Sequence, residues 1–278
     1  MQVKLATHYG FCFGVKRAIK IAQEHKNSAT MGPLIHNQKE IDRLNNDYDV
    51  GLYNSLEDVK DNDTVIIRTH GITKNDLEKL KEKKDVNVIN ATCPFVTTPQ
   101  QIVKDMSQEK YSIVIFGDEN HPEVKGVKSY GDDVHVVLTT QELENIDFKY
   151  KKIATVAQTT RKKEDYLDIV GYLIKKYTEI RVFNTICDAT FENQAATRKL
   201  AKEVDIMIVI GGKNSSNTKQ LFNIAKEHCN DSYLIEDEKE LESNWFKDKT
   251  ICGVTAGAST PDWIIQKVVD QIEADNFN

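Results

Sequence analysis

Short apolar runs alternate with amphipathic segments along the chain. The runs at residues 111–116 and 206–210 are almost wholly apolar and end at Gly117 and Gly211, which is typical of strands buried on both faces. Between such runs, apolar residues recur at the i, i+3, i+4, i+7 spacing of a helix. Three such sets are Val15, Ala18, Ile19 and Ala22; Val170, Leu173, Ile174 and Tyr177; and Ile265, Val268, Val269 and Ile272. This alternation predicts an α/β fold with mainly parallel sheets.

One pattern recurs three times, at intervals of about a third of the chain. An apolar strand ends at an Asn, turns, and presents a cysteine where a helix begins, first at 88–93 and again at 182–187. A looser copy runs from Val3 to Cys12. We therefore predict three related α/β subdomains, each a small sheet flanked by helices: residues 13–92, residues 93–186, and residues 187–278 together with 1–12. The third sheet is expected to be closed by the N-terminal strand.

Composition restricts the class of protein. The 278 residues are 40% hydrophobic and 29% charged, which is ordinary for a globular protein. A net charge of −6 argues against a nucleic-acid partner. No apolar run approaches the roughly 20 residues of a membrane helix, and the first residues lack the apolar region of a signal peptide. We expect a cytoplasmic protein, in which five cysteines favour metal binding or catalysis over disulfides.

The three repeated cysteines, Cys12, Cys93 and Cys187, predict a metal or cluster site. Thiolates favour zinc, copper(I) or iron–sulfur clusters, and structural zinc commonly uses close Cys-x-x-Cys pairs that this chain lacks. One cysteine from each subdomain suits an iron–sulfur cluster with one iron left open to a substrate. Cys229 and Cys252 lie outside the repeat, and we interpret them as buried apolar residues.

A second group of residues predicts an anion site. Ser215, Ser216 and Asn217 precede a helix expected at 218–227, and Ser259 precedes one expected to open at Pro261. Helix N-termini bind phosphate through free backbone N–H groups and a partial positive charge. The same residue types are also common helix caps, so each alone fits either role.

Histidines and an acid extend this group. His36, His70 and His121 each follow a strand end, where an imidazolium could donate to phosphate. Glu123 stands in a helix first turn, where it could stabilise the helix or act as a proton donor if burial raises its pKa. Thr159 and Thr160 could hold a substrate hydroxyl or cap the next helix. Because Lys and Arg are nearly absent from these motifs, helix ends, hydroxyls and histidines are expected to hold the anion.

The motifs together resemble the 4-hydroxy-3-methylbut-2-enyl diphosphate reductase family, from Cys12 to Pro261. The matching segments are Gly10-Phe11-Cys12-Phe13-Gly14-Val15, Arg68-Thr69-His70-Gly71, Asn90-Ala91-Thr92-Cys93-Pro94, His121-Pro122-Glu123-Val124, Gln158-Thr159-Thr160, Thr185-Ile186-Cys187, Gly211 to Thr218 and Thr255 to Pro261. Eight segments in the family's order are far more specific than any one of them.

The resemblance implies a trefoil of three subdomains around a central [4Fe-4S] cluster, recoverable as [3Fe-4S], held by Cys12, Cys93 and Cys187. It implies an allylic diphosphate substrate, reductive loss of its hydroxyl to give isopentenyl and dimethylallyl diphosphate, and ferredoxin or flavodoxin as electron donor. The pathway would be the non-mevalonate route to isoprenoids. The residues implied for the diphosphate are His36, His70, His121, Ser215, Ser216, Asn217 and Ser259. Glu123, Thr159 and His121 would be catalytic, with Thr159 and Thr160 beside the substrate.

Two other classes of function stay open on the residues alone. A non-catalytic iron–sulfur electron carrier or redox sensor would explain the cysteines and leave the histidines, Glu123 and the serines without a role. A phosphate-ester binding protein without a cluster would leave the cysteine repeat unexplained.

Overall fold

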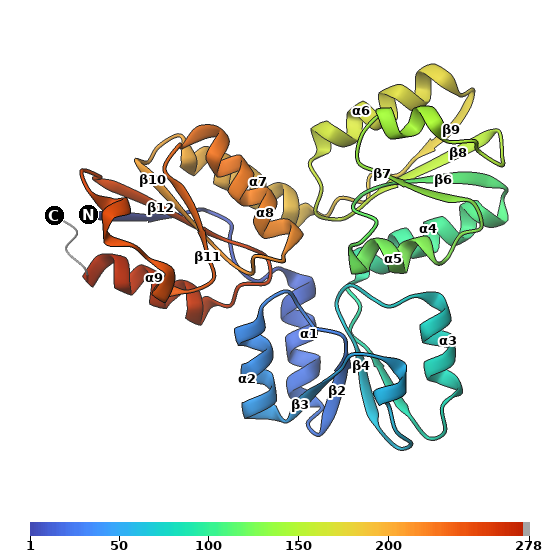
Figure 1. The fold of residues 1–278 in the computed structure, drawn as a ribbon, viewed down its shortest axis with the longest axis horizontal. Coiled ribbons are helices and arrows are strands. Elements are labelled where there is room, and N and C mark those ends of the chain that lie inside the picture. Colours follow the sequence, from blue (N-terminus) through green and yellow to red (C-terminus); the bar gives the residue numbers. More distant parts are fainter. Residues whose placement is uncertain (275–278) are drawn as a thin grey trace. The chain divides into compact units, whose positions relative to one another are not determined.

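The computed structural model describes residues 1–274 and contains three four-stranded sheets in which every strand pair is parallel (Figure 1). The strands are β1 (Gln2–Leu5), β2 (Ser28–Met31), β3 (Val50–Tyr53), β4 (Thr64–Ile67), β5 (Asn87–Asn90), β6 (Tyr111–Phe116), β7 (Val134–Val137), β8 (Lys152–Ala157), β9 (Glu179–Val182), β10 (Ile206–Ile210), β11 (Ser232–Ile235) and β12 (Ile251–Ala256). The predicted α/β class with three small parallel sheets is therefore confirmed.

The three sheets share one strand order. It is β3-β2-β4-β5 in the first, β7-β6-β8-β9 in the second and β11-β10-β12-β1 in the third. The N-terminal strand thus completes a sheet built from the last third of the chain, with Leu5 paired to Val254. Because parallel strands end at the same edge of a sheet, each sheet collects the residues that follow its strands at one edge.

A helix follows each of the three cysteines. The helices are α1 (Phe13–Glu24), α2 (Gln38–Tyr48), α3 (Lys74–Glu82), α4 (Pro94–Gln108), α5 (Pro122–Lys128), α6 (Lys163–Lys176), α7 (Asp188–Ala201), α8 (Ser216–His228) and α9 (Asp262–Ala274), with 3-10 turns at Leu56–Asp58, Gln141–Asn145, Glu238–Glu240 and Ser243–Phe246. Since α1, α4 and α7 each begin one residue after a cysteine, the predicted strand-to-helix setting of the thiols is confirmed.

None of the helices in residues 1–274 has both the length and the apolar character needed to cross a membrane.

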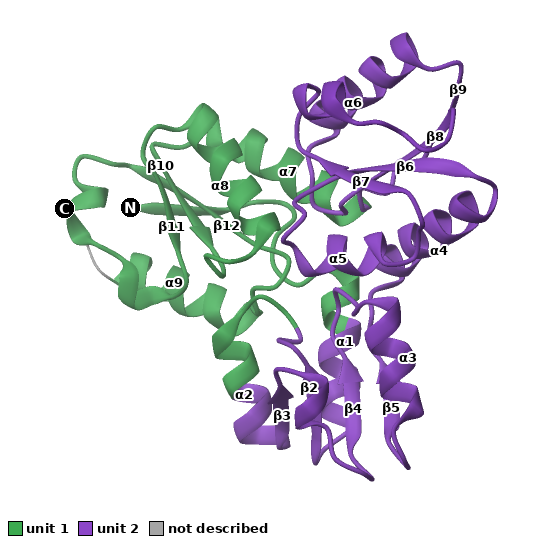
Figure 2. Ribbon diagram, turned by 45° about the vertical axis from the view of Figure 1, so that its right-hand side comes forward, with its two compact units in different colours: residues 1–16, 35–42, 188–278 green, residues 17–34, 43–187 purple. Residues whose placement is uncertain are grey.

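The chain divides into two compact units (Figure 2). Unit 1 contains residues 1–16, 35–42 and 188 onward, and unit 2 contains residues 17–34 and 43–187. Unit 1 holds the sheet completed by β1, and unit 2 holds the other two sheets. This division does not test the three predicted subdomains, whose boundaries stay a prediction.

Helices cover both faces of the sheet in unit 1, because β10 is apolar on both faces. Ile206, Ile208 and Ile210 pack with α9, whereas Met207 and Val209 pack with α7 and α8. Alternate side chains of a strand point to opposite faces, so this continuous apolar run is buried throughout. The predicted strands at 111–116 and 206–210 are both confirmed and fully buried.

Two of the three predicted helix faces are confirmed, and of the third only Leu173 is buried. The predicted apolar residues of α1 and α9 are buried. In α6, however, Ile174 is 61% exposed, and the buried face consists of Tyr166, Ile169 and Leu173. The Tyr166 ring stacks on Phe116, and its hydroxyl lies 3.2 Å from the carbonyl oxygen of Phe183. Burial of this large aromatic residue fixes the orientation of the helix.

Candidate active site

The three repeated cysteines have equivalent backbone settings. Each cysteine follows one strand of a sheet, and its backbone N–H donates to a carbonyl that follows the adjacent strand. The acceptor is the second residue after the end of that adjacent strand, namely β12, β4 or β8. The pairs are Cys12 to Ala258 O (3.3 Å), Cys93 to Thr69 O (3.0 Å) and Cys187 to Thr159 O (3.1 Å). The same hydrogen bond therefore positions each thiol at the carboxyl edge of a sheet and directly before a helix.

The side chains of these cysteines suit a soft metal. All three are half-buried, and no disulfide joins cysteines within residues 1–274. Three thiols at matching positions are a donor set that fits an iron–sulfur cluster with one iron left without a cysteine. Cys229 and Cys252 are buried, as predicted, and burial raises the pKa of the Cys252 thiol to about 12. Cys252 is thus held as a thiol, which is the form that does not bind metal.

Arg17 fixes the loop that carries Cys93. Its Nη1 donates to Thr92 O at 3.2 Å, and its Nη2 donates to Asn90 O at 3.3 Å. Both acceptors lie in the three residues immediately before the cysteine. A guanidinium holds two carbonyls in a fixed geometry, which a single lysine amine does not.

We expect Arg17→Ala to lower the free energy of unfolding by about 1–3 kcal/mol, because two hydrogen bonds from a charged donor are lost. The Cys93 loop should loosen as well, so iron bound at the three predicted cysteine ligands should be lost to a chelator faster. Urea unfolding and the rate of iron release measure the two effects. Lys20→Ala is the control, since this exposed residue of the same helix makes a single polar contact with residues 1–274, an i,i+4 ion pair with Glu24. Equal iron release from both variants would show that Arg17 does not hold the loop.

Glu123 and Thr159 form a buried pair in unit 2. Glu123 is 2% exposed and Thr159 is 6% exposed. The Thr159 N–H donates to Glu123 Oε1 at 2.7 Å, and the Thr159 hydroxyl donates to Oε2 at 2.8 Å. Burial raises the pKa of the Glu123 carboxyl, although both Thr159 hydrogen bonds and the charge of Arg161 oppose the rise. The site therefore contains an acid that favours its protonated form more than an exposed glutamate does.

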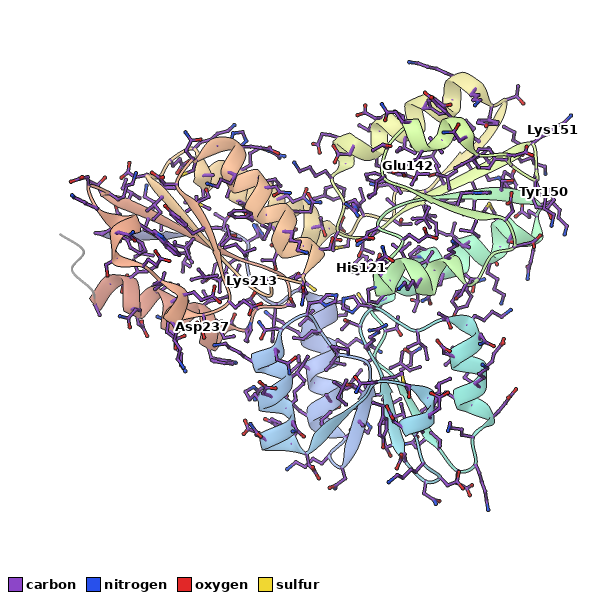
Figure 3. The ribbon with its side chains drawn as sticks, viewed as in Figure 1. His121, Glu142, Tyr150, Lys151, Lys213 and Asp237 are labelled. Atoms are coloured by element: carbon purple, nitrogen blue, oxygen red, sulfur yellow. The ribbon has the colours of Figure 1, made fainter. Side chains whose placement is uncertain are left out.

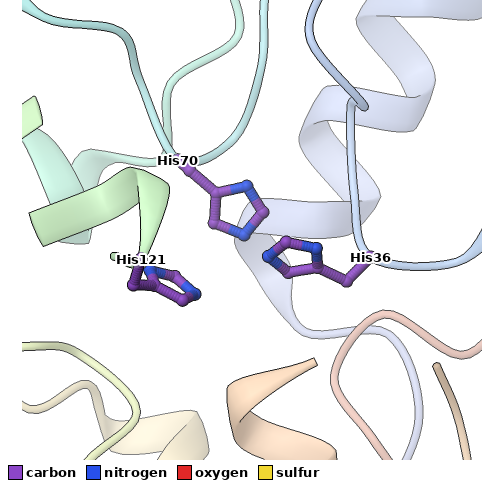
Figure 4. A group of neighbouring side chains, drawn as sticks. All are labelled: His36, His70 and His121. Carbon is purple, nitrogen blue, oxygen red and sulfur yellow. The ribbon is translucent and has the colours of Figure 1, made fainter. Parts of the chain in front are cut away.

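His121 lies at the start of α5, at the same carboxyl edge (Figure 3). Its Nδ1 accepts the backbone N–H of Glu123 at 3.2 Å, so in the neutral ring the proton is on Nε2. The His70 ring meets the His121 ring edge to face, with centroids 5.4 Å apart (Figure 4). His121 is itself the N-cap of α5, a role that the sequence pattern did not predict, and in the neutral ring it is Nε2 that can donate a hydrogen bond.

The helix N-terminus at Ser215 gathers polar groups in unit 1. Ser215 caps α8 by accepting the Thr218 N–H at 3.3 Å, so the helix begins at Ser216, two residues earlier than predicted. Asn217 lies in the first turn and is 5% exposed. Its two amide atoms are buried and have no hydrogen-bond partner within residues 1–274. A buried amide is costly unless it binds something, so this feature fits a polar ligand at the helix N-terminus.

His36 and Ser259 lie together in unit 1. The Ser259 hydroxyl donates to the carbonyl oxygen of His36 at 3.3 Å, and a Cβ added at Gly212 would overlap that same oxygen. Glycine is thus required where the Gly211-Gly212 turn approaches the histidine loop. The following helix, α9, begins at Asp262, one residue later than predicted.

Comparison with known proteins identifies the family. Residues 3–273 match the sequence profile of the family described as LytB protein. The chain belongs to the LytB family. Curated relatives named 4-hydroxy-3-methylbut-2-enyl diphosphate reductase include those of a Nitratiruptor species, 63% identical over 98% of both chains, and Campylobacter curvus, 62% identical over 98% of this chain and 99% of that one.

Solved structures agree with this assignment. One, of (E)-4-hydroxy-3-methyl-but-2-enyl diphosphate reductase, the terminal enzyme of the non-mevalonate pathway, is 43% identical over 99% of this chain and all of that chain, with a TM-score of 0.72. Another, of the E-1-hydroxy-2-methyl-but-2-enyl-4-diphosphate reductase from Plasmodium falciparum, is 28% identical over all of this chain and 89% of that chain, with a TM-score of 0.92. The LytB family member described here therefore shares their fold over residues 1–274.

The predicted residues of this LytB chain are divided between the two units. Unit 1 contains Cys12, His36, Ser215, Ser216, Asn217 and Ser259, and unit 2 contains His70, Cys93, His121, Glu123, Thr159, Thr160 and Cys187. Sequence reasoning missed three arginines, Arg17, Arg68 and Arg161. Arg68 stands inside the Arg-Thr-His-Gly motif, so the signal was present, but arginine on a polar strand end is most often a surface residue.

Proposed function

We propose that this LytB family member is a 4-hydroxy-3-methylbut-2-enyl diphosphate reductase. It removes the allylic hydroxyl of its substrate with two electrons and two protons, and gives isopentenyl or dimethylallyl diphosphate and one water. This is the final step of the non-mevalonate pathway. The observation that carries the proposal is the match to reductases of this name over 98% of both chains, with the three cysteines at equivalent strand-to-helix junctions.

Cys12, Cys93 and Cys187 are the proposed ligands of a [4Fe-4S] cluster. When bound, such a cluster supplies the two electrons, one at a time, and a Lewis-acidic iron. Ferredoxin or flavodoxin is the proposed electron donor. The absence of disulfides within residues 1–274 agrees with a reducing compartment, so we place the enzyme in the cytoplasm.

Glu123 and Thr159 are the proposed proton donors for the departing hydroxyl. Protonated Glu123 donates through Oε2 to the Thr159 hydroxyl, which lies 2.8 Å away and passes its own proton to the substrate oxygen. The backbone N–H of Thr159 keeps the carboxyl oriented at Oε1. Since Glu123 is almost inaccessible to water, the Thr159 hydroxyl is the route by which its proton reaches a ligand.

The diphosphate is proposed to bind groups that donate hydrogen bonds. In unit 2 these are the Nε2–H of His121, the ring of His70 and the hydroxyl of Thr160. In unit 1 they are the Asn217 amide, the Ser215, Ser216 and Ser259 hydroxyls, the first N–H groups of α8 and the His36 ring. Binding at several fixed donors holds the carbon chain in place, so the reaction does not depend on a chance encounter.

An anaerobic assay tests this proposal. We expect the purified protein to be brown, to contain iron and sulfide, and to oxidise reduced methyl viologen only when the allylic diphosphate is added. A brown protein that never oxidises the dye with this substrate would instead be an electron carrier or redox sensor. A colourless protein that binds the diphosphate would be a phosphate-ester binding protein.

A further inference from the structure

Arg68 closes the turn that presents His70. The Gly71 N–H donates to Arg68 O at 3.0 Å, which makes residues 68–71 a hydrogen-bonded turn. The Arg68 side chain bonds the other end of the same turn, since its Nε donates to Gly71 O at 3.2 Å. Gly71 has a φ of +72°, a value that favours glycine. His70 therefore lies in a turn that is stabilised by a backbone hydrogen bond and by a hydrogen bond from the Arg68 side chain.

The Arg68 guanidinium also packs on a second loop. It lies over Gly32, where an added Cβ would stand 2.7 Å from Nη1. Next to this contact, the Thr69 N–H and hydroxyl both donate to Leu34 O, at 3.2 and 2.8 Å. Hydrogen bonds thus join the turn at 68–71 to the loop at 32–34. Because Gly32 has no side chain, the guanidinium of Arg68 can pack against it.

The charge of Arg68 has no carboxylate partner in the described part of the chain. Within residues 1–274 the bond to Gly71 O is its one hydrogen bond, and no acidic oxygen lies within 4 Å. The side chain is half-buried, and burial lowers the pKa of the guanidinium. A partly desolvated charge without a counter-ion is unfavourable, and an anionic ligand would compensate it.

We propose that Arg68 supplies the positive charge that attracts the substrate diphosphate beside His70, and that it positions the His70 turn at the same time. This inference rests on the proposed function. Guanidinium groups pair well with phosphate oxygens, and a charge in a partly buried site acts more strongly than one in water. The sequence motifs suggested helix ends, hydroxyls and histidines for this site, and Arg68 adds a permanent positive charge to them.

Binding of inorganic diphosphate to the holoenzyme, measured by calorimetry, tests the charge directly. We expect Arg68→Gln to weaken this binding, and to raise KM for the allylic diphosphate, by about tenfold. Arg68→Lys keeps the charge but loses the hydrogen bond to Gly71 O. Its affinity for diphosphate should therefore lie within about threefold of the wild-type value. Arg181→Gln is the control, because it also removes one positive charge, here from an exposed ion pair with Glu109. Its affinity for diphosphate should equal that of the wild type.

The outcomes separate the possible roles. Equal losses in the Lys and Gln variants would mean that Arg68 only shapes the turn, and wild-type binding in Arg68→Gln would mean that its charge is not used. Either result overturns the inference. If Arg68→Gln does not fold, Arg68→Met replaces it, because Met keeps the packing on Gly32 without a charge. A wild-type protein with neither diphosphate binding nor turnover would instead overturn the proposed function.

Discussion

Replacing Glu123 with glutamine should lower turnover by about two to four orders of magnitude, the usual effect of removing a general acid. The amide fits the same site, because its oxygen can accept the Thr159 N–H and its NH₂ can donate to the Thr159 hydroxyl. The Thr159 geometry should therefore persist, and only the transferable proton is lost. We expect unchanged iron content and unchanged KM, with the whole loss in kcat.

Steady-state kinetics with reduced methyl viologen measure this effect, and the visible spectrum reports the cluster. Glu119→Gln is the matched control, since Glu119 precedes the same helix but is exposed and paired with Lys128. The control should keep nearly full activity. If Glu123→Gln were as active as the wild type, Glu123 would not be the proton source.

The pH profile gives a second view of the same residue. The pKa of Glu123 is raised by burial, so its protonated form persists to higher pH than that of an exposed glutamate. Turnover that requires this proton is retained below the raised pKa and falls as pH rises through it. We expect the wild-type kcat to fall in this way as pH rises, and we expect the remaining kcat of Glu123→Gln not to show this fall.

Cys93→Ser should remove most of the iron and nearly all of the turnover. A serine hydroxyl is a poor ligand for the soft iron–sulfur site, because it stays protonated where a cysteine gives a thiolate. The fold should persist, since the N–H at residue 93 still donates to Thr69 O and the following helix still begins at Pro94. Iron analysis and the absorbance of the brown cluster measure the loss.

Cys229→Ser is the control for this change. Cys229 is buried at the C-terminus of α8, where its thiol contacts the carbonyl oxygens of Val204 and Asp231, and a serine hydroxyl can also donate there. Its iron content should equal that of the wild type. A Cys93→Ser variant with a full complement of iron would contradict the ligand assignment.

Local patterns were sufficient to predict most of the fold. The apolar runs at β6 and β10 and the helix after each cysteine could be read from the sequence, because burial on both faces and helix starts leave local signals. The orientation of α6 could not, because it depends on Tyr166 stacking against Phe116, a contact between residues far apart in the chain. Tertiary packing here overrides the periodic pattern.

The sequence predicted which residue types the candidate site contains, but it did not predict their burial or their hydrogen-bond partners. The position of Glu123 in a helix first turn is visible in the sequence, but its burial and its two bonds to Thr159 arise when β8 is placed beside β6. The same is true of Arg17 and Arg68, whose partners are backbone carbonyls that no side-chain pattern reveals.

The pairing of β1 with β12 constrains how the protein matures. A ribosome makes residues 251–256 long after residues 2–5, so the sheet of unit 1 cannot be complete until residues 251–256 have been synthesised. The two sheets of unit 2 contain only strands from residues 28–182 and are free of this delay. The N–H of Cys12 donates to Ala258 O, just beyond β12, so during synthesis the backbone of Cys12 is fixed in place later than that of Cys93 or Cys187.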